Sequence, residues 1–309
     1  MQTMKQLSKS IGMTLNHEAV EAVEPDASMV DTGVGNRLRR RRSACIIGAG
    51  VSGLVAAKVF LSSGYEVFVA EKGPEIGGVW APSKSYPGVR TQTPRDLYCF
   101  TDFPMPDSYP EWPTGHQVYQ YLCNYARHFG VMPKIHLNTD VRRLSRLKAG
   151  DGWEVELSNG GNVQVHNFDV VVICSGRFSS PKRLALPGSE DFKAAGGVIV
   201  HSSEYLSNDQ AKGKDVVVLG YSKSATDLAM EALAAKARSV TVIYREATWK
   251  LPYFFGNLVN FKNILYCRAS EAMFMPWSPS AVGRFLRKLF APFNLGELAR
   301  PGGASRVAV

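Results

Sequence analysis

The sequence predicts an α/β fold with two Rossmann-like dinucleotide-binding units, because the order strand, glycine-rich turn, helix, strand occurs twice. The first unit starts with an apolar run at Ala44, continues with a helix over Val51–Ser63 and ends with a strand over 65–70. The second unit spans 215–244, with an apolar strand, an Ala-rich helix and another strand. A chain of 309 residues is long enough for about two such domains. Between the units, a helix is predicted over 110–129 and a strand meander over 153–174.

The charge distribution disfavours a nucleic-acid-binding protein. The formal net charge is +9, but five arginines within residues 37–42 supply much of it. Residues 1–42 mix acids with small polar residues and show no sustained period, so we expect a flexible N-terminal extension. Residues 282–300 have the pattern of a basic amphipathic helix, which either packs on other parts of the protein or contacts a membrane peripherally.

Cysteine usage and hydropathy limit the class further. The five cysteines form no C-x-x-C pair and no cluster with histidines, so neither a metal site nor a dithiol reductase is expected. The sequence has no apolar run of the roughly 18 residues that span a bilayer, so we expect no transmembrane segment and a cytoplasmic location.

The first glycine-rich turn carries the strongest signal. It reads Gly48-Ala49-Gly50-Val51-Ser52-Gly53, the G-x-G-x-x-G pattern between a strand and a helix. Gly48 allows the tight turn, Gly50 allows a pyrophosphate to approach the backbone, and Gly53 allows close helix–strand packing. Phosphates are then expected at the helix N-terminus, beside Ser52.

An acidic residue follows at the end of the second strand. Glu71 stands 23 residues after Gly48, which suits hydrogen bonds from a ribose diol, and Lys72 next to it is included in the predicted cofactor site. The glycine pattern with this acid predicts dinucleotide binding.

Two further stretches identify the type of dinucleotide. Gly77-Gly78-Val79-Trp80 follows Glu71 closely, and residues 91–104 read TQTPRDLYCFTDFP. Together these stretches resemble the flavin-containing monooxygenases that use FAD and NADPH, across roughly residues 43–290. The resemblance implies that Gly78, Val79, Trp80 and Thr93 lie at the flavin. It also implies that Gln92, where many members have asparagine, is a catalytic residue near the reactive edge of the flavin.

A third family pattern is only partly present. Gly197, His201 and Tyr205 match F-x-G-x-x-x-H-x-x-x-(F/Y), but Ala195 stands at the leading aromatic position and Phe192 comes three residues earlier. In the family this pattern is chiefly architectural, so His201 receives no acid–base role.

The second glycine-rich turn is degenerate, and it is assigned to NADPH. It reads Gly220-Tyr221-Ser222-Lys223-Ser224-Ala225, whose small residues permit close approach and whose hydroxyls and ammonium suit a phosphate. Arg245 follows the next strand, where an arginine fits the ribose 2′-phosphate of NADPH. The alternative is an arginine that pairs with the neighbouring Glu246.

The resemblance implies an N,N-dimethylaniline-type monooxygenase. NADPH reduces FAD, oxygen adds to give a C4a-peroxyflavin, and one oxygen atom passes to a nitrogen or sulfur of a small molecule. Baeyer–Villiger oxygenation is one alternative. Another is a truncated chain that binds nucleotides but is non-catalytic or uncoupled, because family members are longer and return to complete the FAD domain.

The expected organisation is an extension over 1–42, an incomplete FAD domain over 43–205, a partial NADPH domain over 206–300 and a tail over 301–309. The substrate and the oligomeric state are left open.

Overall fold

The computed structural model describes residues 42–148, 150–247, 250, 252–256 and 258–266. The predicted extension up to residue 41, the basic segment 282–300 and the tail 301–309 therefore lie outside the described residues.

The first unit is a four-stranded parallel sheet in the order β3-β2-β1-β7. The strands are β1 (Ser43–Ile47), β2 (Glu66–Ala70), β3 (Ile135–His136) and β7 (Val170–Ile173), and helix α2 (Val51–Ser62) connects β1 to β2. The predicted strand–turn–helix–strand order is confirmed.

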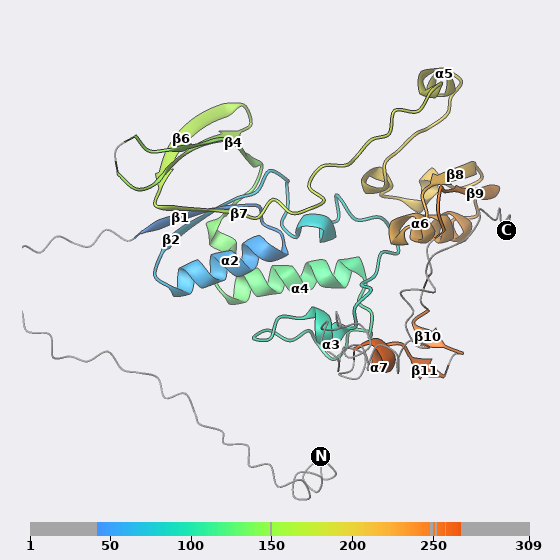
Figure 1. Cartoon of the computed structure of the whole chain (residues 1–309), viewed down its shortest axis with the longest axis horizontal. Coiled ribbons are helices and arrows are strands. Elements are labelled where there is room, and N and C mark those ends of the chain that lie inside the picture. Colours follow the sequence, from blue (N-terminus) through green and yellow to red (C-terminus); the bar gives the residue numbers. More distant parts are fainter. Residues whose placement is uncertain (1–41, 149, 248–249, 251, 257, 267–309) are drawn as a thin grey trace, which may run out of the picture. The chain divides into compact units, whose positions relative to one another are not determined.

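Alternation along the strands places this sheet between two apolar layers. Ile46 and Val69 face a core formed with α2 and α4 (Gly115–His128), whereas Cys45 and Phe68 face the opposite layer. Figure 1 shows the two helices on one face of the sheet and the antiparallel strands on the other. A sheet covered on both faces gives the short apolar strands seen in the sequence.

The antiparallel layer consists of β4 (Thr139–Arg146), β5 (Trp153–Asn159) and β6 (Asn162–Phe168). The meander predicted over 153–174 is confirmed for β5 and β6, with the turn after Asn159, but its last strand, β7, pairs in parallel with β1 in the other sheet. Strand β4 was not predicted, and its register shifts between Val141 and Arg143, which interrupts the alternation of a regular strand.

Helix α4 confirms the helix predicted over 110–129, but it begins later, at Gly115. Thr114 caps it: its hydroxyl accepts a hydrogen bond from the Gln117 backbone N–H at 3.2 Å, and the Gln117 side chain accepts one from the Thr114 N–H at 2.9 Å. This reciprocal pair satisfies donors that have no partner within a helix end.

The second unit contains β8 (Asp215–Leu219), α6 (Lys223–Ala234) and β9 (Ser239–Ile243), as predicted, with β8 and β9 parallel. Helix α6 packs on one face of this pair through Ala232, while Val217, Leu219 and Ile243 on the other face are 58%, 47% and 53% exposed.

The remaining elements are short. They are η1 (Gly78–Trp80), α3 (Arg95–Tyr98), η2 (Met132–Lys134), α5 (Ser189–Ala194), η3 (Ser202–Glu204), η4 (Asn208–Gln210), β10 (Phe254–Phe255), β11 (Val259–Asn260) and α7 (Lys262–Leu265).

The partial family pattern has a structural role here. The His201 ring accepts the Ser203 backbone N–H at 3.2 Å and caps η3. A Cβ on Gly197 would lie 2.2 Å from the Phe192 ring, so the displaced aromatic packs directly on the glycine of the pattern.

The aromatic stack on the antiparallel side generates a pH prediction. Phe68 stacks on His136 with ring centroids 3.9 Å apart, and the His166 ring stacks on Phe68 with centroids 6.2 Å apart. Burial, and then the nearby His166, lower the pKa of His136 from its ordinary value of 6.5. The unfolded chain therefore binds this proton more readily than the folded one, so stability is kept above about pH 6.5 and lost as pH falls below it.

As the pH is lowered from about 7.5 to about 5.5, we expect the unfolding free energy of His136→Gln to decrease less than that of the parent. The free energy is measured by urea unfolding at each pH. The exposed His116→Gln is the control. An unchanged pH slope in His136→Gln would contradict the prediction.

Candidate cofactor-binding site

A cavity of about 380 Å³ lies at the carboxyl ends of β1, β2 and β7. This is the edge of a parallel sheet where ligands of α/β folds bind. Seven predicted cofactor residues line it: Gly48, Gly50, Ser52, Glu71, Lys72, Gly78 and Val79. Gly53, the last glycine of the motif, is buried behind them.

The glycine turn has the geometry for which its glycines were predicted. Gly48 has φ +103°, and a Cβ there would lie 2.6 Å from the Cys174 carbonyl oxygen. A Cβ on Gly53 would lie 1.8 Å from the Gly48 carbonyl oxygen. Neither position can take a side chain without moving backbone, so the turn keeps α2 close to the sheet.

The N-terminus of α2 is suited to an anion. Gly50 is the N-cap, so no side chain bonds to the first-turn amides, and the first turn has no acidic residue. A Cβ on Gly78 would lie 3.2 Å from the Gly50 Cα, so the two backbones approach closely beside the cavity. The free amides of the first turn and the positive end of the helix dipole thus favour a phosphate group there.

Glu71 holds the turn in place. It is 5% exposed; its Oε2 accepts the Ala49 N–H at 2.7 Å and its Oε1 accepts the Gly73 N–H at 2.8 Å. The sequence pattern predicted contacts to a ribose diol, whereas these backbone contacts are an additional role. Because each carboxylate oxygen can accept more than one hydrogen bond, the ribose contact stays a prediction.

Three cations line the cavity: Lys72, Lys84 and Arg177. Against them stand the carboxylates of Glu71 and Asp140, so the lining carries a positive balance that suits a pyrophosphate. Lys84, Asp140 and Arg177 were missed in the sequence. Arg177 directly follows Cys174-Ser175-Gly176, so the loop after a third parallel strand was the signal that could have indicated it.

Trp80, Gln92 and Thr93 do not line this cavity. The Trp80 Nε1–H donates to the Tyr98 hydroxyl at 3.0 Å, and burial raises the pKa of that phenol. Gln92 is exposed and Thr93 is half-buried. Their roles at the flavin remain predictions.

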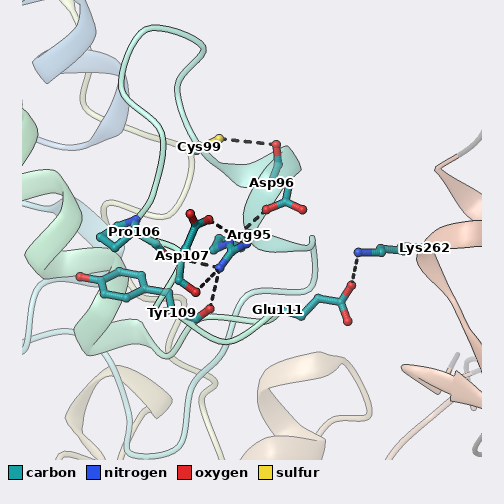
Figure 2. Close-up of polar contacts among 8 residues, drawn as sticks. All are labelled: Arg95, Asp96, Cys99, Pro106, Asp107, Tyr109, Glu111 and Lys262. Carbon is teal, nitrogen blue, oxygen red and sulfur yellow. Dashed lines mark hydrogen bonds and ion pairs between the residues drawn. The ribbon is translucent and has the colours of Figure 1, made fainter. Parts of the chain in front are cut away.

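Arg95 holds the segment that carries Gln92. Its Nη1 donates to the carbonyl oxygens of Asp107 at 2.7 Å and Tyr109 at 2.9 Å, and its Nε pairs with Asp96 at 3.0 Å (Figure 2). A guanidinium can bind several acceptors at once in this way, and an ammonium cannot match that geometry. The loop therefore closes around one side chain.

A later part of the chain packs on the same segment. Glu111 pairs with Lys262 and accepts the Asn260 side-chain amide at 2.6 Å, and Figure 2 shows Lys262 reaching it from the other side of the view. The Tyr253 hydroxyl donates to the Thr91 carbonyl at 3.2 Å, next to Gln92. The backbone around Gln92 is thus held from both sides.

The second glycine turn joins β8 to α6. Gly220 has φ +123°, and its N–H donates to the Ile243 carbonyl at 2.8 Å. Ser222 is the N-cap of α6, and its side chain makes no capping hydrogen bond. The Tyr221 ring packs on Tyr244 with centroids 4.5 Å apart.

The two predicted cations of the second turn differ in their surroundings. The Lys223 ammonium pairs with Asp227, one turn further along α6, and Arg245 is exposed just after β9. Lys250, which was not predicted, lies over the Tyr221 ring with its Nζ 4.8 Å from the centroid. Phosphate contacts of Lys223 and Arg245 stay predictions.

Comparison with known protein families shows to which family this chain belongs. A family model described as flavin-binding monooxygenase-like matches residues 41–291. The chain belongs to this family. The match covers both glycine turns and the segment between them, as the resemblance in the sequence predicted.

Curated relatives agree with the family. The chain is 33% identical over 224 residues to flavin-containing monooxygenase 5 of Rattus norvegicus and 32% identical over 221 residues to flavin-containing monooxygenase 2 of Homo sapiens. These matches cover 68% and 67% of this chain but 41% of each relative. The chain thus spans about two fifths of the length of the curated relatives it matches.

Solved structures of flavin monooxygenases share the fold. S-allyl-L-cysteine S-oxygenase from Allium sativum is 28% identical with a TM-score of 0.56, covering 69% of this chain and 54% of that one. OTEMO in complex with FAD and NADP is 25% identical with a TM-score of 0.60, covering 68% and 40%.

Among the described residues, no helix is long and apolar enough to cross a membrane, and no cluster of three or more His, Cys, Asp or Glu side chains could hold a metal ion.

Cys174 offers a probe of the cavity that needs no mutation. It is half-buried and lines the cavity, and burial raises the pKa of its thiol, so alkylation should be slow near neutral pH and faster at about pH 9. We expect added FAD to slow the alkylation of Cys174 several-fold, as followed by peptide mass spectrometry, because a bound dinucleotide covers it.

Cys99 is the internal control, since it is half-buried but does not line the cavity. Equal protection of both thiols would indicate a general tightening of the protein, and no protection of Cys174 would contradict the cavity as the FAD site.

Proposed function

We propose that this chain binds FAD and NADPH and belongs to a monooxygenase that transfers one oxygen atom to a nitrogen or sulfur of a small molecule. The observation that carries the proposal is the cavity at the sheet edge. There the uncapped N-terminus of α2, the close approach of Gly50 to Gly78, and three cations meet.

The residues at this cavity fit the dinucleotide half of FAD. The α2 amides would bind the pyrophosphate, and Lys72, Lys84 and Arg177 would balance its charge. Glu71, already bonded to the turn, would orient the ribose. Trp80, Gln92 and Thr93 lie outside the cavity, and we assign them to the flavin ring on the family resemblance.

The second turn supports NADPH as the electron donor. Gly220, Tyr221, Ser222, Lys223 and Ser224 lie at the start of α6, and Arg245 follows β9 where it can reach a 2′-phosphate. The solved relative OTEMO was crystallised with both FAD and NADP.

The redox chemistry, hydride acceptance from the nicotinamide and electron transfer to molecular oxygen, would be supplied by FAD when it is bound. The protein's contribution is to hold the two nucleotides, to orient the Gln92 amide as a hydrogen-bonding group, and to exclude water. The clamp of Arg95, Tyr253 and Glu111 fixes the backbone that carries Gln92.

Nitrogen and sulfur are favoured as acceptor atoms by the names of the relatives. Dimethylaniline monooxygenase [N-oxide-forming] 2 of Pan troglodytes is 32% identical, and the garlic S-oxygenase is 28% identical. A cyclohexanone monooxygenase from Rhodococcus at 25% identity keeps a Baeyer–Villiger reaction as a weaker alternative.

A second candidate is NADPH oxidation without oxygen transfer. Gln92, predicted at the reactive edge of the flavin, is exposed, and this favours the second candidate, because a monooxygenase must shield its site from water. In that reaction NADPH, a proton and oxygen give NADP⁺ and hydrogen peroxide, so measured peroxide distinguishes it from oxygenation.

The function is tested with Gly50→Val. We expect this variant to lose FAD affinity by about tenfold or more, because the branched side chain fills the space between the turn and Gly78, while NADP⁺ binding persists. FAD content is read from the absorbance of the purified, FAD-supplied protein, and NADPH consumed, peroxide formed and an oxygenated sulfide or amine probe are measured together.

Gly50→Ala is the matched control. Its Cβ would lie 3.6 Å from the Gly78 Cα, an ordinary contact, and Gly50 has φ −80°, so this variant should fold and keep much of the FAD. A parent chain without FAD, or a Gly50→Val variant as yellow as the parent, would overturn the site. Peroxide without oxygenated probe would favour the second candidate.

Arg245→Ala tests the choice of NADPH over NADH. One charged hydrogen-bonded contact is worth roughly 1.5–3 kcal/mol, so NADPH affinity should fall about tenfold to more than a hundredfold, while NADH affinity stays unchanged. Arg238→Ala, at the other end of β9 and paired with Asp215, controls for a general loss of positive charge. Equal weakening of both nucleotides by Arg245→Ala would exclude a 2′-phosphate contact.

A further inference from the structure

Tyr86 connects the two nucleotide-binding units. It lies in the segment between η1 and α4, yet its hydroxyl donates to Asp227 Oδ2 on α6 at 3.0 Å, across 141 residues of sequence. Its ring packs against the small core of the second unit, which contains Tyr205, Ala211 and Ala232. A residue of the first unit thus reaches the helix assigned to NADPH.

The contact falls on the first turns of α6. The Lys223 ammonium donates to both carboxylate oxygens of Asp227, and the Ser224 side chain is a further polar neighbour of the Tyr86 phenol. Lys223 and Ser224 are two of the residues predicted to contact the NADPH phosphates. The phenol and the Lys223 ammonium therefore share one carboxylate, and Ser224 lies at the same end of the helix.

The phenol acts as a donor at neutral pH. Burial, followed by weaker effects that include the charge of Asp227, raises the pKa of Tyr86 to about 12. Asp227 accepts this O–H and the Lys223 N–H groups together, so its charge is divided between two partners.

A second contact keeps the segment against the helix. A Cβ on Gly88 would lie 1.8 Å from Glu231 Oε1, so the Glu231 carboxylate packs directly on the glycine backbone. The Asn208 amide donates to the other oxygen of Glu231 at 3.0 Å. Glu231 is one turn beyond Asp227, so the segment contacts two successive turns of α6.

We propose that Tyr86 is a positioning residue for NADPH, which acts through Asp227 to set where the Lys223 ammonium lies at the start of α6. The proposal rests on the proposed NADPH site. With the phenol present, Asp227 has a second donor and holds Lys223 less strongly. Without it, Asp227 depends on Lys223 alone and competes with a phosphate for the ammonium.

Tyr86→Phe tests the proposal, since it removes the hydroxyl and keeps the ring. With FAD-supplied protein, we expect the Kd for NADP⁺ to rise about threefold to tenfold while the Kd for FAD stays unchanged. In turnover, KM for NADPH should rise and kcat should not. Tyr205→Phe is the matched control, because Tyr205 lies in the same small core and, within the described part of the chain, its hydroxyl donates to Asn208 and not to α6.

A double-mutant cycle separates positioning from a general structural effect. If Tyr86 acts through Lys223, Lys223→Gln should itself weaken NADP⁺ binding, and adding Tyr86→Phe to it should weaken binding no further. Additive losses would show that Tyr86 does not act through Lys223. Lys223→Gln with the affinity of the parent would overturn the proposal even if Tyr86→Phe does not fold.

The failure of this inference is distinguishable from that of the proposed function. A parent that binds FAD and NADP⁺, with Tyr86→Phe unchanged in both, would overturn the positioning role alone. A parent that binds FAD but not NADP⁺ would overturn the NADPH assignment and this inference with it, and a parent without FAD would overturn the function first.

Discussion

The buried carboxylate of Glu71 is the contact on which the first unit depends. Its side chain joins the glycine turn, through Ala49, to the chain beyond β2, through Gly73. Its own backbone pairs with His136 and Thr139, at the ends of β3 and β4. One residue therefore links the first glycine turn, the parallel sheet and the start of the antiparallel layer. A buried carboxylate is tolerated only with such partners, since desolvation without hydrogen bonds would be costly.

The two nucleotide-binding units share a pattern but not an environment. The strands of the first unit are covered by α2 and α4 on one face and by β4–β6 on the other, so Cys45 and Ile46 are both fully buried. The strands of the second unit are covered on one face in the described residues, and their outward residues Val217 and Ile243 are exposed. The same strand–turn–helix sequence thus gives a cavity in the first unit, where neighbouring loops add walls, and a more open turn in the second.

The local features were predictable because neighbouring residues determine them. The Gly48–Gly53 turn, α2, α4, the β5–β6 hairpin and the β8–α6–β9 order follow from glycine positions and apolar periods. Strand β4 was missed because charged residues and a register shift break its alternation. At the site, Lys84 comes from a loop that only the fold brings to the cavity, whereas Arg177 follows a parallel strand whose end could have indicated it.

Lys223 shows which contacts can be predicted from the sequence and which cannot. Its spacing from Asp227 is that of a helical ion pair, so the pairing could have been predicted from the sequence. The phenol that shares the same carboxylate could not, because Tyr86 lies 141 residues away and no local pattern relates the two.

The chain between β2 and α4, residues 71–114, contacts both glycine turns. Connections of this length without a long element of their own are uncommon in compact domains unless they serve a function. Gly77 donates to the Ala49 carbonyl in the first glycine turn, whereas Tyr86 donates to α6 beside the second. Thr91 and Glu111 then accept contacts from Tyr253 and Asn260. A displacement of this connection would alter both turns and the backbone of Gln92 together, so its contacts link the geometry of the first glycine turn to that of the second.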